Sequence, residues 1–323
     1  GDNTYEDGDD GIDYIDGGEG VEDNGGDTVD YSAFGSTHNI TVDLSITDSG
    51  NSDYTTVSVN SGSNDYIKNI ENIKGSAGAD IISGDSSNNI LDGSAGNDTL
   101  SGGEGNDTII GGTGIDTVTY ITSTSGITVD LKDTDLDGYE VSSDGLNGKD
   151  DLSGIEVLIA SNNDDNLIGS DGNDTLIGAG GNDTISGGLG ADDLRGYGLS
   201  TGTDSHLDTV SYAYVGSLNS VTVDLSAGSG LVTVGTDTSD TDTLTGFENV
   251  IGGAGADNIT GSSVANIIKA GSGADIITGG AGADDLQGEA GNDTFKATSA
   301  TDGADIIDGG IDSDTLDYSA LGS

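Results

Sequence analysis

Large apolar residues recur every nine positions through long stretches of this chain, always within the same frame of glycine and aspartate. In residues 102–119 two such units follow each other directly, and both fit the template G-G-x-G-x-D-x-U-x, where U is a large apolar residue. The segment around U is rich in Ile, Val, Leu and Thr, which is typical of a short strand. Helical periodicity is absent. The pattern predicts strands of two to five residues joined by turns.

The nine-residue units form blocks that alternate with spacers of a second type. Blocks cover residues 75–119, 160–195 and 252–313, and residues 1–26 hold a truncated block. Spacers cover residues 27–74, 120–159 and 196–251, and residues 314–323 begin another. Each block leads into a D-T-V/L-x-Y unit, and residues 27–36 return nearly unchanged as 314–323. We therefore expect a window of a longer array.

The spacers repeat among themselves and predict further strands. Strands of the I-T-V-D-L type are expected at residues 40–44, 127–131 and 221–225, and I-E-N-I-like strands at 70–73, 155–158 and 247–250. A stack of such units buries the apolar row of each turn against the neighbouring turns. The predicted architecture is an all-β solenoid with two nonapeptides per turn. The Tyr residues at 31, 120, 212 and 318 are expected to pack at block ends.

Charge changes the picture, because 59 acidic residues face only 7 basic ones, for a formal net charge of −52. Nine of the acids are Glu and fifty are Asp. Self-repulsion on this scale opposes a compact state unless counter-ions bind specifically. Nucleic acid and anionic membranes are excluded as partners, because nothing here neutralises phosphates. No transmembrane run is present, and without Cys no disulfide can stabilise the fold.

The turn residues suit one ligand, a hard divalent cation. Glycines at positions one, two and four allow positive φ, so that carbonyls can point into one loop. The aspartate at position six adds charge, and Ca²⁺ takes six to eight carbonyl and carboxylate oxygens. Without bound metal, a chain with 4% aromatic residues lies close to a disordered composition.

The tandem nonapeptides, with the D-T-V/L-x-Y, I-T-V-D-L and I-E-N-I units between them, resemble the RTX (repeats-in-toxin) family. The resemblance implies a parallel β-roll with multiple Ca²⁺ ions between loops of successive turns, each shared by repeats two apart. It also implies type I secretion to the bacterial cell surface or the extracellular medium. Carried onto this sequence, the metal ligands are Asp80, Asp98, Asp107, Asp116, Asp165, Asp174, Asp183, Asp192, Asp257, Asp275, Asp284, Asp293 and Asp305.

Some of these positions are expected to differ from the rest. Asp80, Asp192 and Asp257 sit at block ends and are expected to hold half-sites, while Asp305 follows a slipped register. Position six is Asn at 89 and 266, where sites should be weaker or empty; a given Asp can alternatively just cap its turn. A separate D-x-D-x-D-G loop, resembling an EF-hand or dockerin loop, is either a calcium loop or a solvated acidic hairpin. Its candidate ligands are Asp133, Asp135, Asp137 and Asp144.

Catalysis is not expected from this sequence. Residues 198–202 fit G-x-S-x-G and His206 follows, but a nucleophile elbow needs a strand before it and a helix after it. With His38 and His206 as its two histidines, the chain has no H-E-x-x-H metal site.

We expect an extracellular structural segment of a surface-layer, adhesin or filament protein, with copies of itself end to end or surface polysaccharide as partners. The alternative is a calcium-dependent secretion module of an exported enzyme or toxin. A third hypothesis, a glycan- or ice-binding face, uses the in-phase Thr99, Thr108 and Thr117, but Asp193 interrupts the corresponding row after Thr175 and Thr184.

Overall fold

The fold consists of short strands and turns, repeated along the chain. A computed structural model describes residues 4–6, 11–18, 26–46, 54–60, 63–132, 139–197, 206–226, 229–234, 241–297 and 303–321. The chain forms two compact units, Gly1–Ser161 and Asn162–Ser323. The described ranges contain 32 strands and one short 3-10 helix, η1 (Ser319–Leu321). They include no helix with the length and apolarity needed to cross a bilayer.

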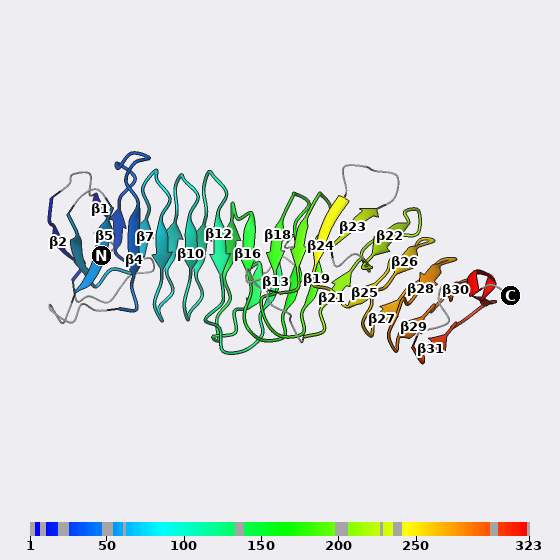
Figure 1. Ribbon diagram of the computed structural model, residues 1–323. Helices are drawn as coiled ribbons and strands as arrows, with labels where there is room; N and C mark the ends of the chain where they lie inside the picture. The colour runs from blue at the N-terminus through cyan, green and yellow to red at the C-terminus, as the bar shows by residue number, and fades with distance from the viewer. Residues whose placement is uncertain are drawn as a thin grey trace. The chain divides into compact units, whose positions relative to one another are not determined.

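In the first unit, consecutive strands of the block alternate between two parallel sheets (Figure 1). One sheet has the order β1 (Thr4–Glu6), β3 (Thr28–Asp30), β7 (Asn72–Lys74), β9 (Ile90–Asp92), β11 (Thr108–Ile110) and β15 (Asp151–Ser153). The other pairs β4 (Ile40–Asp43), β8 (Ile81–Ser83), β10 (Thr99–Ser101), β12 (Thr117–Thr119) and β16 (Val157–Ile159). The spacers add β2 (Tyr14–Asp16), β5 (Thr55–Val59), β6 (Asp65–Lys68), β13 (Thr128–Asp130) and β14 (Val141–Ser143).

The second unit repeats this arrangement. One sheet runs through β17 (Asn166–Ile168), β19 (Thr184–Ser186), β21 (Thr209–Ser211), β25 (Asn249–Ile251), β27 (Ile267–Lys269), β29 (Asp285–Gln287) and β31 (Ile306–Asp308). The other runs through β18 (Thr175–Ile177), β20 (Asp193–Arg195), β24 (Thr241–Thr245), β23 (Ser229–Val234), β22 (Val221–Asp224), β26 (Asn258–Thr260), β28 (Ile276–Thr278), β30 (Thr294–Lys296) and β32 (Thr315–Asp317).

Strand register confirms the predicted β-roll. Thr99 pairs with Ile81 on one side and Thr117 on the other, so neighbours in a sheet lie 18 residues, or two nonapeptides, apart. The strand between them, which starts at Thr108, pairs in the other sheet. The in-phase threonines 99, 108 and 117 therefore do not share one face, and the expectation of a single Thr row is wrong.

Each nonapeptide contributes one side chain to the core between the two sheets. The position-eight residues Leu91, Leu100, Ile109 and Val118 are fully buried, and their strand neighbours are mostly half-buried. Strands with one inward and two outward side chains bury little apolar surface per residue. Tyr31, Tyr120 and Tyr212 fill the wider coils at block ends, whereas Tyr318 is 57% exposed.

In each unit a spacer strand pairs antiparallel with its neighbours, after which the parallel pairing of the roll continues. In the first unit β5 pairs antiparallel with both β4 and β6, and in the second unit β23 does the same with β22 and β24. The I-T-V-D-L strands form close to the predicted positions. The I-E-N-I-like strands begin at Asn72, Val157 and Asn249 instead. Their Glu residues lie in the preceding turn, where the carboxylate accepts a backbone amide.

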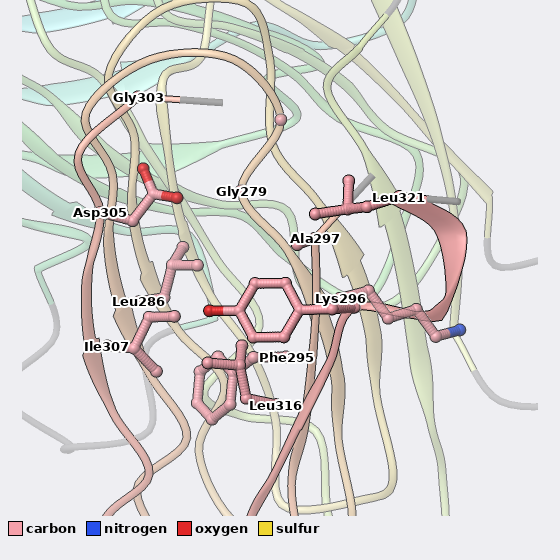
Figure 2. A pocket seen from close by; sticks show the side chains of 12 residues that line it. Gly279, Leu286, Phe295, Lys296, Ala297, Gly303, Asp305, Ile307, Leu316 and Leu321 are labelled. Carbon is pink, nitrogen blue, oxygen red and sulfur yellow. The ribbon is translucent and has the colours of Figure 1, made fainter. Parts of the chain in front are cut away.

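A cavity of about 310 Å³ opens beside the last coils of the second unit. Figure 2 shows Leu286, Phe295, Ile307 and Leu316 gathered on one side of it. These are side chains of strands β29 to β32, and the strand β31 is largely exposed. The cavity is thus the open end of the apolar core.

Removing a position-eight side chain should destabilise the roll. We expect Ile109→Ala to cost about 2–5 kcal/mol, because the side chain is fully buried and the rigid coils cannot close the cavity. Ile115→Ala removes an equal side chain that is 58% exposed and should cost less than about 0.5 kcal/mol. Denaturant unfolding at saturating calcium measures both, and equal losses would contradict the assignment of the core.

Candidate metal centres

The position-six aspartates are buried although they carry charge. Asp98, Asp107 and Asp116 are at most 1% exposed in the first unit, as are Asp275 and Asp293 in the second. Each lies in the turn immediately before a strand, so that its side chain points back into the turn. Burying an ionised carboxylate is costly unless it is paired, hydrogen-bonded or bound to a metal.

One oxygen of each carboxylate accepts a hydrogen bond from a backbone amide of the preceding coil. The backbone amide of Asp80 donates to Asp98 Oδ1 at 2.8 Å, and the amide of Asp98 donates to Asp116 Oδ1 at the same distance. In the second unit, Asp257 and Asp275 donate in the same way to the Oδ1 atoms of the aspartates 18 residues later, at 2.7 and 2.9 Å. The aspartates thus form ladders along the turns of each unit.

The other oxygen is buried without a hydrogen-bond donor in a set of these residues. The set comprises Asp98, Asp107, Asp116, Asp183, Asp275 and Asp293 through their Oδ2 atoms, and Asp144 of the spacer has the same feature. A buried anionic oxygen without a donor is destabilising, and a bound cation removes that penalty. These turns therefore fit the cation that the sequence predicts.

The glycine at position one leaves the space that this oxygen uses. A Cβ on Gly93 would lie 2.4 Å from Asp98 Oδ2 and 2.7 Å from the carbonyl oxygen of Gly111 in the next coil. On Gly178 it would lie 2.1 Å from Asp183 Oδ2. Carboxylate and carbonyl oxygens of neighbouring coils thus converge at this point, as a hard cation requires.

The expectation that position one needs positive φ is wrong. Positive φ occurs at positions two and four, as at Gly103 (100°) and Gly105 (114°), whereas the position-one glycines of the blocks provide space. Ser94, Ala179 and Glu289 occupy position two with φ of 71°, 76° and 69°, a conformation that strains residues with a Cβ.

Burial also raises the pKa of these carboxyl groups. Desolvation, reinforced by neighbouring carboxylates, raises the pKa of Asp98 and Asp107 to about 7, and that of Asp183 to about 8. Desolvation likewise raises the pKa of Asp275 to about 6. Without a cation Asp98, Asp107 and Asp183 hold protons near neutral pH, and a cation would displace them.

Three predicted ligands cap their own turns. The Oδ2 atoms of Asp80, Asp174 and Asp257 accept backbone amides four residues earlier, at 2.6, 2.7 and 2.7 Å. Asp80 and Asp257 lie at block ends, where half-sites are predicted and where capping of the turn is the alternative; the half-sites stay a prediction. Asp174 lies inside a block, where we had expected a full site.

The remaining nonapeptide aspartates lie in the same ladders. Asp165 donates its amide to Asp183 Oδ1, Asp192 accepts from Asp174, and Asp284 accepts from the amide of residue 266. Asp305 accepts the amide of Asp284 at 3.2 Å in spite of its slipped register. Their role as metal ligands stays a prediction.

The D-x-D-x-D-G loop is not tested, because Asp133, Asp135 and Asp137 lie outside the described residues. Asp144 is fully buried, and its Oδ1 accepts the amides of Leu146 and Gly148 at 2.7 and 2.8 Å. It therefore holds the turn that leads into β15. The G-x-S-x-G segment, residues 198–202, also lies outside the described residues.

Sequence reasoning missed several acidic residues in the ladders. Asp27, Asp208 and Asp314 are the first residues of D-T-V/L-x-Y units. Asp116, a predicted ligand, begins the same motif, so the motif could have identified these three residues as well. Asp65, Asp150 and Asp242 are fully or almost fully buried in the spacers and accept the amide of the aspartate one coil earlier. The spacer Glu residues also accept such amides, namely Glu71 from Asp27, Glu156 from Asp116 and Glu248 from Asp208.

Within the described ranges, no three acidic or histidine side chains gather as a metal-binding group. A cation in these turns would therefore take much of its coordination from backbone carbonyls, a ligand type that Ca²⁺ accepts readily.

Comparison with protein families gives a match to the repeats themselves. The model of the RTX calcium-binding nonapeptide repeat (four copies) matches residues 69–100, 83–118, 159–194, 242–263, 260–295 and 299–320, which together cover half of the chain. The matched segments contain every nonapeptide aspartate predicted above and exclude the D-x-D-x-D-G loop. No curated protein matches the chain.

Neutralising one buried carboxylate should remove cation binding locally. We expect Asp183→Asn to lower the number of bound calcium ions by about one or two, because its Oδ2 atom is a buried oxygen without a donor. Isothermal titration calorimetry measures the number. Asp171→Asn removes an exposed charge from the same block and should leave it unchanged; an equal loss in both variants would refute a local site.

Stability of the calcium-free roll should fall as pH rises. The pKa values of Asp98, Asp107 and Asp183 lie above the ordinary value of 3.8, so the folded state holds protons that the unfolded chain releases. Their contribution is complete below pH about 4 and is lost as pH passes about 7 to 8. The folded fraction in chelator, followed by circular dichroism from pH 5 to pH 8, measures the trend, which Asp183→Asn should flatten near pH 8. A folded fraction that rises from pH 5 to pH 8 would contradict it.

Proposed function

The chain belongs to the RTX calcium-binding nonapeptide-repeat family, and from this premise we propose that it is an extracellular structural segment that folds on calcium after secretion. It would form part of a surface-layer, adhesin or filament-forming protein. The observation that carries the proposal is the ladder of buried aspartates, in which one oxygen joins two coils and the other lacks a donor.

Calcium concentration would decide whether this ladder is stable. Extracellular calcium modules bind at roughly 10⁻⁴–10⁻³ M. At millimolar calcium each such site adds about 1–2 kcal/mol by linkage, and a dozen sites add enough to decide the folding of a domain. At sub-micromolar cytosolic calcium this contribution vanishes. The chain would thus remain unfolded until export and fold outside the cell.

A scaffold role is supported by the composition of the two units from roll and spacer strands. The described residues of both units consist of roll and spacer strands, and their charged turns are used in joining coils. The strands of a parallel roll pair with the strands of the coils on either side, and further coils of another copy could pair in the same way. Self-association end to end, or binding to cell-surface polysaccharide, are the partner proposals that follow.

The alternative is a secretion and folding module attached to an exported enzyme or toxin. It requires the same calcium chemistry and an effector in another part of the protein. The family is compatible with both roles. The scaffold is favoured because both units are built from the same parts, parallel roll strands with an antiparallel spacer strand, β5 in the first unit and β23 in the second.

Calcium titration tests the proposal directly. We expect circular dichroism and small-angle scattering to record one sharp change from an expanded coil to a β-rich particle at roughly 10⁻⁴–10⁻³ M calcium, reversed by EDTA. Magnesium at equal concentration is the control, because it keeps its water and tolerates the loop geometry poorly. A compact fold unaffected by EDTA would overturn the calcium-dependent function. Particles longer than one chain would support the scaffold over the secretion module.

A further inference from the structure

Two position-six residues carry a carboxamide, and both use it in the same way. Asn89 Oδ1 accepts the amide of Asp85 at 2.9 Å, while its Nδ2 donates to the carbonyl oxygen of Glu71 at 2.6 Å. In the second unit, Asn266 Nδ2 donates to the carbonyl oxygen of Glu248, also at 2.6 Å. Both asparagines are 1% exposed. An N–H donor thus joins the turn to the previous coil.

The previous coil explains why an amide is needed there. The amides of Glu71 and Asn72 both donate to the carbonyl oxygen of Asp27, at 3.1 and 3.0 Å. The amides of this turn are thus used within the spacer, and the Glu71 carbonyl oxygen is the group that faces residue 89. An ionised aspartate at this position would place a carboxylate oxygen against that carbonyl oxygen, and a cation between them would stabilise the pair.

A second kind of donor occurs where the ladders enter the spacers. The Tyr120 hydroxyl donates to Asp150 Oδ2 at 2.8 Å, and the Tyr212 hydroxyl donates to Asp242 Oδ2 at the same distance. The Oδ1 atoms of both aspartates accept the amide of the preceding ladder aspartate. The same Oδ2 position has no donor in Asp116.

We infer that the side chains of Asn89, Asn266, Tyr120 and Tyr212 take the place of a cation. Each lies where a row of predicted calcium turns ends, and each supplies a neutral hydrogen-bond donor there. The inference rests on the proposed calcium-dependent function and goes beyond it, because it assigns which turns stay metal-free. In the first unit one row begins at Asn89, continues through Asp107 and ends at Asp150 with its tyrosine. Both ends of that row have a protein donor.

The consequence is a division of the fold by calcium dependence. As calcium is withdrawn, coils joined through Asn89, Asn266, Tyr120 and Tyr212 keep their contacts longer than the coils between them, which lose their ions. The junctions between blocks and spacers would thus be the last segments to open in chelator and the first to form on folding.

Converting a neutral donor into an oxygen tests the inference. We expect Asn89→Asp to need a higher calcium concentration than the wild type to fold, as followed by circular dichroism, and to bind about one more ion per molecule by isothermal titration calorimetry. Asn88→Asp adds the same charge one residue away on an exposed side chain and should change neither the ion count nor the calcium dependence.

Tyr120→Phe provides an independent second test, because it keeps the ring and removes the donor to Asp150 Oδ2. It should likewise raise the ion count by about one and shift folding to higher calcium. Tyr66→Phe, whose ring stacks on Tyr14 at 4.9 Å, is the matched control.

Outcomes separate this inference from the proposed function. A wild-type chain that binds no calcium overturns the proposed function. A wild-type chain that binds calcium, with variants that fold at the wild-type calcium concentration and gain no ion, overturns the inference alone. If Asn89→Asp does not fold at any calcium concentration, Tyr120→Phe decides by the same criteria.

Discussion

The fold depends on a carboxylate that serves two coils at once. The Asp98 Oδ1 atom accepts the amide of Asp80, while its other oxygen remains inside the turn without a donor. The first interaction fixes the spacing of the coils and supplies a partner for an amide that a strand of three residues would leave exposed. The oxygen without a donor makes the stability of that spacing depend on a bound cation. Structure and ligand dependence therefore come from the same side chain.

This arrangement explains a composition that would otherwise resemble a disordered chain. A nonapeptide strand typically buries a single large side chain, such as Leu100 or Ile109, so the apolar core alone gives little stability per residue. Aspartate takes the role that additional core residues have in other folds, and glycine makes room for its oxygens. The large negative charge of the sequence is then concentrated where cations can reach it in rows.

Local repetition made much of this predictable. Position eight of the nonapeptide predicted the core, and position six predicted the ladder aspartates, because both depend on neighbours within one turn. Asp150 and Asp242 escaped prediction, because their role depends on spacer coils of irregular length that return to the roll. The need for glycine at position one was misread, because sequence does not distinguish a residue required for its φ from one required for its missing Cβ, as at Gly93.

The 18-residue register has a further consequence for folding. Coils such as those at Thr99 and Thr117 are nearly interchangeable, so a chain that skipped a pair of repeats would still bury its apolar row and form similar hydrogen bonds. In a uniform array no residue makes such a shifted alignment less stable. Asn89 does so, because its Nδ2 donates to the Glu71 carbonyl oxygen in the correct alignment. In a shifted alignment it would face a backbone amide, as Asp98 does, and two donors would oppose each other. The irregular spacer junctions thus determine which coils pair, and they make a single alignment of the repeats the most stable one.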